Sequence, residues 1–157
     1  MREKMAADVQ KTLEQELPKW AEGKTTLKDI KGYTDHELYA IAHMAYFYLK
    51  QGKTEEAKVL FEGLVALDPM NGYYYRALGV IFYKLGEADR ALRQFGYAIR
   101  VAPGLPHAYV NRAEVNLALG KGPKAAKDLK QALALMGPKT PQLRQKAQAL
   151  LLALNTD

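Results

Sequence analysis

Apolar and small residues recur along this chain with a period of 34 residues. Gly52, Gly86 and Gly120 are 34 positions apart, and Pro69 and Pro103 repeat at the same interval. Between these markers, apolar residues follow one another at spacings of three and four, which is the period of an amphipathic α-helix. The pattern predicts pairs of helices joined by short turns, with each pair ended by a proline.

A second set of markers lies in register between the glycines and the prolines. The middle unit has Tyr75, Leu78, Gly79, Phe82, Ala91, Phe95 and Pro103. The first unit has Ile41, Met44, Ala45, Tyr48, Ala57, Phe61 and Pro69, and the third has Tyr109, Arg112, Ala113, Asn116, Ala125, Leu129 and Ala132. This set resembles the tetratricopeptide repeat, although the third unit departs from it at two core positions.

We therefore predict an all-α fold, a tetratricopeptide repeat superhelix of three helix-turn-helix repeats. The predicted segments are an N-terminal helix and connector (1–34), three repeats (35–139, at about 38–71, 72–105 and 106–139) and a C-terminal capping helix (140–157). The N-terminal helix is expected over 5–17, and Thr140 is expected to cap a last helix that begins at Pro141. The capping helix covers the face that the last repeat would otherwise expose.

The turn within each repeat is predicted to depend on its glycine. Gly52, Gly86 and Gly120 stand where the first helix of each unit ends, and glycine enters the left-handed backbone region at little cost. The second helices are expected to begin at about residues 54, 88 and 123. The expected total is eight helices and no strand.

Composition and spacing exclude most enzyme chemistry. The 157 residues include no cysteine and no serine, which excludes disulfides, thiolate ligands and the commonest nucleophiles. His36 and Glu37 begin like a helical zinc motif, but Ala40 stands where the second histidine belongs. Glu55 and Glu56 lie on a predicted exposed helix, with no apolar pocket to separate their pKa values. We predict no enzyme activity, no metal site and no cofactor.

Hydropathy and the first residues point to the cytoplasm. The longest uncharged run, Leu38 to Leu49, has 12 residues, whereas a membrane-spanning helix needs about 20. The first five residues carry mixed charge and no apolar run follows them, unlike a secretory signal. We therefore expect a cytoplasmic protein without membrane association.

The net charge of +6 is unevenly placed. Residues 1–71 carry 10 basic and 12 acidic side chains, whereas residues 72–157 carry 13 basic and 5 acidic ones. A basic half of this kind is typical of a solvated helix face, or of a protein that binds an acidic protein, nucleic acid or an anionic surface. Nucleic-acid binding is only a weak third hypothesis for the function of the chain. A surface that binds a single strand needs aromatic residues among its basic ones, and none are interleaved with the lysines at 121, 124, 127 and 130.

The predicted groove is lined by four residues from the first helix of each unit. In such a superhelix these helices line the concave side, and residues spaced by three, four and three share one face. They are Tyr39, Ala42, Tyr46 and Leu49, then Tyr73, Arg76, Val80 and Tyr83, then His107, Val110, Glu114 and Leu117. Four tyrosines, several aliphatic side chains and few charges favour an extended, apolar peptide as ligand.

The tyrosines are predicted to divide between the groove and the core. Tyr48, Tyr75 and Tyr109 stand where the repeat packs its own helices, so they are expected in the core. For the four groove tyrosines the alternative is burial, because a helical stripe is often part of the core. The positions that clamp a chain-end carboxylate in co-chaperones of the heat-shock type hold Ala42, Tyr46, Ala77, His107 and Asn111. A chain-end carboxylate is therefore not expected as ligand.

Several stretches resemble one particular family of tetratricopeptide proteins. They are Leu27–Gly32, Glu37–Ala42, Gly52–Ala57 with Phe61, Leu64 and Leu67-Asp68, and Arg144–Leu150. Together they are similar to class II chaperones of bacterial type III secretion, over roughly residues 25 to 152.

The resemblance implies a function in protein export. Such chaperones bind hydrophobic translocator proteins in the cytoplasm and keep them soluble and unpaired before export. They hold a short segment containing Pro and Leu in the concave groove, whose first-repeat positions match Tyr46 and Leu49 here. The resemblance also implies a homodimer formed through the N-terminal helix and, in some members, a regulatory partnership with a transcription activator.

An alternative remains open on the residues. The family tends to be acidic whereas this chain is basic, and the ending Asp68-Pro69 is closer to an ordinary tetratricopeptide protein. The alternative function is a general peptide-binding adaptor or assembly scaffold outside type III secretion.

Overall fold

The structure is a computed structural model that describes residues 7–8, 11, 15, 18–19 and 22–154. Within this part the secondary structure is helical, which confirms the all-α prediction. The elements are α2 (Leu27–Lys31), α3 (Asp35–Lys50), α4 (Thr54–Leu67), α5 (Gly72–Lys84), α6 (Ala88–Val101), α7 (Pro106–Ala118), α8 (Gly122–Leu135) and α9 (Pro141–Leu154). The N-terminal helix expected over 5–17 lies largely outside the described residues.

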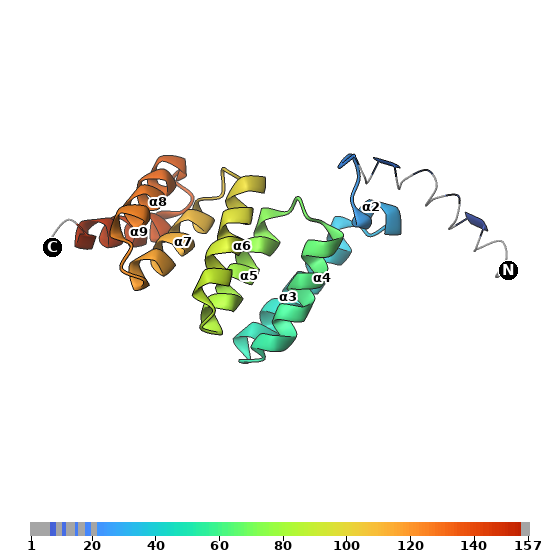
Figure 1. Cartoon of the computed structure of the whole chain (residues 1–157), viewed down its shortest axis with the longest axis horizontal. Coiled ribbons are helices and arrows are strands. Elements are labelled where there is room, and N and C mark those ends of the chain that lie inside the picture. Colours follow the sequence, from blue (N-terminus) through green and yellow to red (C-terminus); the bar gives the residue numbers. More distant parts are fainter. Residues whose placement is uncertain (1–6, 9–10, 12–14, 16–17, 20–21, 155–157) are drawn as a thin grey trace.

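The helices follow one another in space as they do in sequence. Figure 1 shows them side by side along the long axis, with α2 near one end and α9 at the other. The pairs α3–α4, α5–α6 and α7–α8 pack within repeats, and α4–α5 and α6–α7 pack between repeats. No helix in residues 22–154 is both long enough and apolar enough to cross a bilayer.

The three turns within the repeats have the same backbone conformation. The φ angles of Gly52, Gly86 and Gly120 are 78°, 80° and 70°, which confirms the predicted left-handed glycines. In each turn the amide of the residue after the glycine donates to a carbonyl five positions earlier: Lys53 to Tyr48 at 2.9 Å, Glu87 to Phe82 at 2.9 Å and Lys121 to Asn116 at 2.8 Å. These bonds satisfy carbonyls that the ending helix leaves unpaired.

The entrance to the array contains helical structure that the sequence analysis assigned to a connector. Thr26 and Asp29 form a capping box, with the Thr26 amide donating to the Asp29 carboxylate at 3.0 Å, and this box starts the short helix α2. A second box, with the Thr34 amide 2.8 Å from the Glu37 carboxylate, starts α3 at Asp35. Both boxes satisfy amides at a helix N-terminus, so they fix where these helices begin.

The last helix begins at Pro141 as predicted, but the Thr140 side chain does not cap it. The Thr140 hydroxyl is buried without a hydrogen-bond partner, while the Thr140 carbonyl accepts from the Arg144 amide at 3.0 Å. The Arg144 side chain donates to the carbonyl of Met136, at the end of α8. This contact ties α9 back to the third repeat.

The tyrosines of the repeat core differ in part from the prediction. Tyr109 is buried, as predicted, and its hydroxyl donates to the Pro103 carbonyl at 2.9 Å. Tyr48 and Tyr75 are only partly buried. The fully buried tyrosine of α5 is Tyr74, 1 % exposed, whose ring centroid lies 6.4 Å from that of Phe61 in the preceding repeat. Helix α5 therefore presents one apolar side to its own repeat and another to the repeat before it.

Gly79 allows α5 and α6 to pack closely. A Cβ at this position would lie 2.5 Å from Cε1 of Phe95, and Phe95 itself is buried. Ala45 and Ala113 hold the equivalent positions of the other repeats and are fully buried. Small residues are thus required where the two helices of a repeat approach each other.

We predict that Gly79→Ala lowers the free energy of unfolding by about 1–3 kcal/mol, because the added methyl overpacks the contact with Phe95. Gly96→Ala on α6 is the matched control, since a Cβ there meets nothing within 4 Å. It should gain about 0.5–1 kcal/mol from helix propensity. Urea unfolding measures both; equal effects of the two substitutions would contradict the packing argument.

A partly buried ion pair joins the two helices of the third repeat. Arg112 Nε donates to Asp128 Oδ2 at 2.8 Å and Arg112 Nη2 donates to Oδ1 at 2.7 Å, in a bidentate arrangement. Asp128 is 5 % exposed, and its hydrogen bonds raise the pKa of Arg112. The sequence pattern shows Arg112 as a departure from the repeat, and the structure shows what replaces the usual apolar contact.

We predict that Asp128→Ala destabilises the protein by about 1–3 kcal/mol, because it leaves the partly buried Arg112 guanidinium without its counterion. The double variant Arg112→Leu with Asp128→Leu should recover most of that loss, since an apolar pair removes the uncompensated charge. Thermal and urea unfolding test this. A double variant no more stable than Asp128→Ala would show that the pair has no such role.

Candidate peptide-binding surface

A row of hollows lies along the surface that α3, α5 and α7 form together, which we call the A-helix face. The first hollow, of about 300 Å³, is lined by Tyr39, Ala42, His43 and Tyr73. The second hollow, of about 350 Å³, is lined by Val80, Tyr83, Lys84, Phe95, Asn111, Glu114 and Val115. The third, of about 590 Å³, is lined by His107 and by Lys139–Leu143 and Lys146 around the start of α9.

The predicted groove residues lie on or beside this row. Seven of the twelve line a hollow: Tyr39, Ala42, Tyr73, Val80, Tyr83, His107 and Glu114. Tyr46, Leu49, Arg76 and Leu117 are partly buried on the same three helices. Eleven of the twelve predicted residues thus line a hollow or are partly buried on α3, α5 and α7, and their role in binding a peptide stays a prediction.

Two predicted groove residues are buried. Ala42 borders the first hollow but is only 2 % exposed. Val110 is fully buried, lines no hollow and has no surface to offer a peptide in this structure. It belongs to an apolar cluster in which residues of α9 pack against α7 and α8. Lys146 of α9 reaches Glu114 of α7, with 2.7 Å between Nζ and Oε1. The capping helix thus covers part of the A-helix face as well as the end of the array, which the sequence analysis did not anticipate.

His43, Lys84 and Asn111 line hollows but were not predicted as groove residues. His43 is four residues from Tyr39, and Lys84 is four residues from Val80. Residues four apart lie on the same side of a helix. A stripe one residue wider would therefore have included His43 and Lys84.

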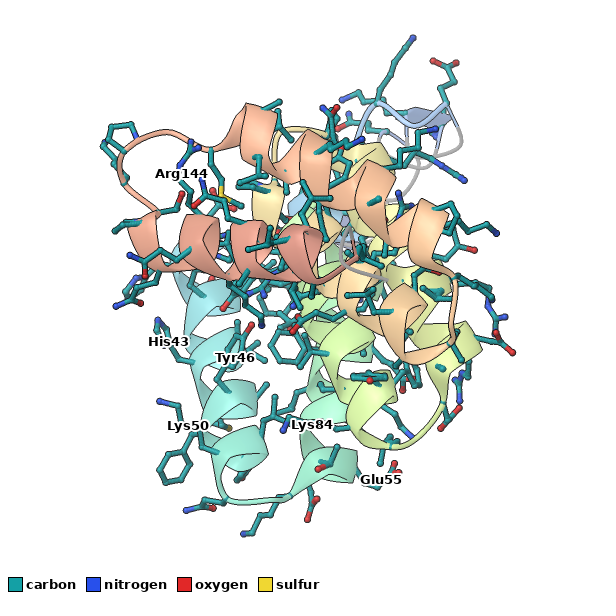
Figure 2. All side chains as sticks on the ribbon, turned by 90° about the vertical axis from the view of Figure 1, so that its left-hand side faces the viewer. His43, Tyr46, Lys50, Glu55, Lys84 and Arg144 are labelled. Carbon is teal, nitrogen blue, oxygen red and sulfur yellow. The ribbon has the colours of Figure 1, made fainter. Side chains whose placement is uncertain are left out.

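An aromatic cluster forms the wall between the first hollow and the core. The Tyr46 ring packs edge-on against Phe61, with centroids 5.3 Å apart, and lies 5.7 Å from the Tyr73 ring. Burial and a hydrogen bond with Tyr46 raise the pKa of Tyr73 well above its ordinary value. In Figure 2, Tyr46 points from α3 toward the other repeats, whereas Lys50 points away from them. Tyr46 and Tyr73 are thus partly structural and partly available to a ligand.

Tyr39 and Tyr83 are the exposed aromatic residues of the row. Their side chains are 51 % and 43 % accessible, and they line the first and second hollows. Tyrosine provides a large apolar contact area at small entropic cost and keeps a hydroxyl for hydrogen bonds to a backbone. The two tyrosines are therefore the strongest anchor candidates on the face.

Polar contacts connect the A helices across the face. Arg76 of α5 donates to Tyr46 Oη of α3 at 3.5 Å and to Asn111 Oδ1 of α7 at 3.2 Å. Asn111 Nδ2 donates in turn to Glu114 at 3.4 Å. Burial and the nearby positive charge of Arg76 lower the pKa of His107, which favours its neutral form. The floor of the face thus combines aromatic hollows with a central guanidinium.

Comparison with known proteins places this arrangement in a family. The tetratricopeptide repeat profile matches residues 44–99 and 82–142. Low calcium response locus protein H of Yersinia pestis is 27 % identical over 130 residues, which cover 82 % of this chain and 76 % of that protein. Tetratricopeptide repeat protein 36 of Caenorhabditis elegans is 46 % identical over 62 residues, 40 % of this chain, and the match spans 35 % of that relative.

Solved structures show the same fold. The type III secretion chaperone SycD of Yersinia enterocolitica, in complex with a peptide of the translocator YopD, superposes with a TM-score of 0.73 at 23 % identity, covering 78 % of this chain and 95 % of SycD. PcrH in complex with the chaperone-binding region of PopD gives a TM-score of 0.74 at 26 % identity, covering 80 % and 96 %. These matches confirm the resemblance seen in the sequence.

Substitution of two tyrosines of α5, one buried and one exposed, distinguishes a core residue from a residue of the candidate surface. Tyr74→Ala should lower the free energy of unfolding by about 3–5 kcal/mol, because it empties a buried aromatic site. The same burial raises the pKa of Tyr74 to about 12. Tyr83→Ala should cost about 1 kcal/mol or less, because its ring is already half exposed. Urea unfolding of both variants tests the assignment, and a Tyr83→Ala protein as unstable as Tyr74→Ala would contradict it.

Proposed function

Because the chain belongs to the tetratricopeptide repeat family, we propose that its A-helix face binds an extended peptide, as a cytoplasmic chaperone of type III secretion. The clients are hydrophobic translocator proteins, which the chain keeps soluble and unpaired before export. The observation that supports this most is the row of aromatic hollows on a fold that matches SycD and PcrH, two chaperones solved with translocator peptides.

The mechanism is binding by mass action. Covering an apolar client segment lowers the concentration of the free client that can aggregate or pair too early. Each buried apolar side chain contributes roughly 1.5–3 kcal/mol of favourable transfer free energy, before the cost of ordering the peptide is subtracted. A few hollows in a row thus allow binding that is specific but still reversible, as release for export requires.

The same proposal includes two partners that the resemblance implies. One is a second copy of this chain, joined through the N-terminal helix. The other is a transcription activator, for a regulatory role that some members of the family have.

A second candidate is a general peptide-binding adaptor or assembly scaffold. It is favoured by the 46 % identity with tetratricopeptide repeat protein 36 over 62 residues and by the basic charge of residues 72–157. The adaptor and the chaperone would use the same face, so they differ in the client and not in the site.

Co-expression with the translocator PopD tests the chaperone function. We expect PopD to be insoluble alone and to co-purify as a soluble complex with this chain. The double variant Tyr39→Ala with Tyr83→Ala should bind at least about tenfold more weakly, as loss of interface aromatics typically costs 1–2 kcal/mol or more. Tyr97→Ala is the matched control, since Tyr97 lies on α6 and is 40 % exposed.

The outcomes separate the two candidates. PopD that stays insoluble with this chain would contradict the chaperone function for this client class and favour the adaptor. A soluble complex that Tyr97→Ala weakens as much as the double variant would contradict the placement of the client on the A-helix face.

A further inference from the structure

Arg76 has an unusual position at the centre of the A-helix face. Its guanidinium is held between α3 and α7 by two neutral acceptors, Tyr46 Oη at 3.5 Å and Asn111 Oδ1 at 3.2 Å. The Arg76 Nε atom is buried and has no hydrogen-bond partner. In residues 22–154 no carboxylate forms an ion pair with Arg76.

Two other arginines of the array, unlike Arg76, are paired with an acid. Arg112, one repeat further on, has the bidentate Asp128, and Arg90 has Glu87 at 2.7 Å. A guanidinium offers five donors in a planar fork that matches a carboxylate, so two neutral contacts leave much of this capacity unused. Arg76 is therefore a partly buried cation whose counterion the described part of the chain does not provide.

The second hollow, beside Arg76, carries little unpaired negative charge. Lys84 lines the second hollow and forms no ion pair in residues 22–154. Glu114 is the acidic residue of that hollow, and its two oxygens are engaged by Lys146 at 2.7 Å and by Asn111 at 3.4 Å. A carboxylate brought to Arg76 would thus meet a guanidinium without an acidic partner and little competing negative charge.

Arg76 also lies between two apolar hollows. Its Cζ atom is 5.6 Å from the ring centroid of Tyr73, which lines the first hollow. Its partner Asn111 lines the second hollow. An extended peptide with an apolar side chain in each hollow must therefore pass over the guanidinium.

We propose that Arg76 binds a side-chain carboxylate of the client, an Asp or Glu that stands between two apolar residues held in the first and second hollows. The inference rests on the proposed function, which it extends from apolar clients to clients with an acidic residue at one defined position. Charge-assisted hydrogen bonds are shorter and roughly twice as strong as neutral ones. Arg76 thus selects the register of a client that the hollows alone would bind in several registers.

A random peptide library tests this without knowledge of the client. Twelve-residue peptides, displayed without a free C-terminus, are selected on the immobilised full chain and on its Arg76→Gln variant. The wild type should enrich Asp or Glu several-fold at one position between two apolar positions. Arg76→Gln should keep the apolar positions and lose the acidic preference. Arg93→Gln removes the same charge from the exposed surface of α6 and should select as the wild type does.

Binding of one selected peptide then measures the interaction between Arg76 and the peptide carboxylate. The peptide is amidated at its C-terminus, so that only its side-chain carboxylate is available, and is compared with its Asp→Asn or Glu→Gln counterpart by fluorescence anisotropy. The acidic peptide should bind the wild type about tenfold more tightly than the neutral one, as expected for hydrogen bonds to a charged group. The ratio should be near one for Arg76→Gln, and Arg76→Lys, which keeps the charge, should retain part of the preference.

The outcomes distinguish this inference from the proposed function. Apolar peptides without an acidic preference, or with a preference that Arg76→Gln retains, would overturn the role of Arg76 and leave the peptide-binding face in place. No enrichment of any peptide over bare support would overturn both. Circular dichroism of each variant confirms folding. If Arg76→Gln does not fold, the ratio of the affinities for the acidic and the neutral peptide is compared between the wild type and Arg76→Lys. A ratio near one on the wild type would then overturn the role of Arg76.

Discussion

The close approach of two helices at one small residue per repeat is the constraint on which the rest of the structure depends. At Gly79 there is no space for a Cβ beside the Phe95 ring, and Ala45 and Ala113 are fully buried at the equivalent positions. The first helix of each closely packed pair has a second apolar side. This side packs on the preceding repeat, as Tyr74 packs near Phe61. The stacking of pairs then places α3, α5 and α7 together on one face, where the hollows form.

Much of the fold could be predicted from the sequence because the repeat period is itself structural. Each Gly at the end of a first helix has the positive φ angle that its position implied, and the six repeat helices follow from the same period. Features outside the repeat needed other signals. The capping box of Thr34 and Glu37 is visible in the sequence and would have placed the start of α3, whereas the pairing of Arg112 with Asp128 depends on how α8 packs on α7. Val110 is buried in an apolar cluster that residues of α7, α8 and α9 form together, and that packing is not visible in the sequence of α7 alone.

The candidate surface combines two kinds of recognition. The hollows and their exposed tyrosines provide apolar contact, which is strong in sum but allows a peptide to slide between registers. The guanidinium of Arg76, held by Tyr46 and Asn111 and without an acidic partner in the described part of the chain, adds a directional contact at one point. A chaperone that must bind firmly and still release benefits from this division, because apolar area sets the affinity while one charge sets the register.

Photo-crosslinking shows directly whether the client lies along the A-helix face. Tyr39, Tyr83 and Tyr97 are replaced one at a time by p-benzoylphenylalanine in the complex with PopD. The three tyrosines are 51 %, 43 % and 40 % exposed, so the probes are similarly accessible and differ in the face that they occupy. We expect crosslinks to PopD from positions 39 and 83 and none from position 97. Crosslinks from position 97, with none from the other two, would contradict this placement of the client.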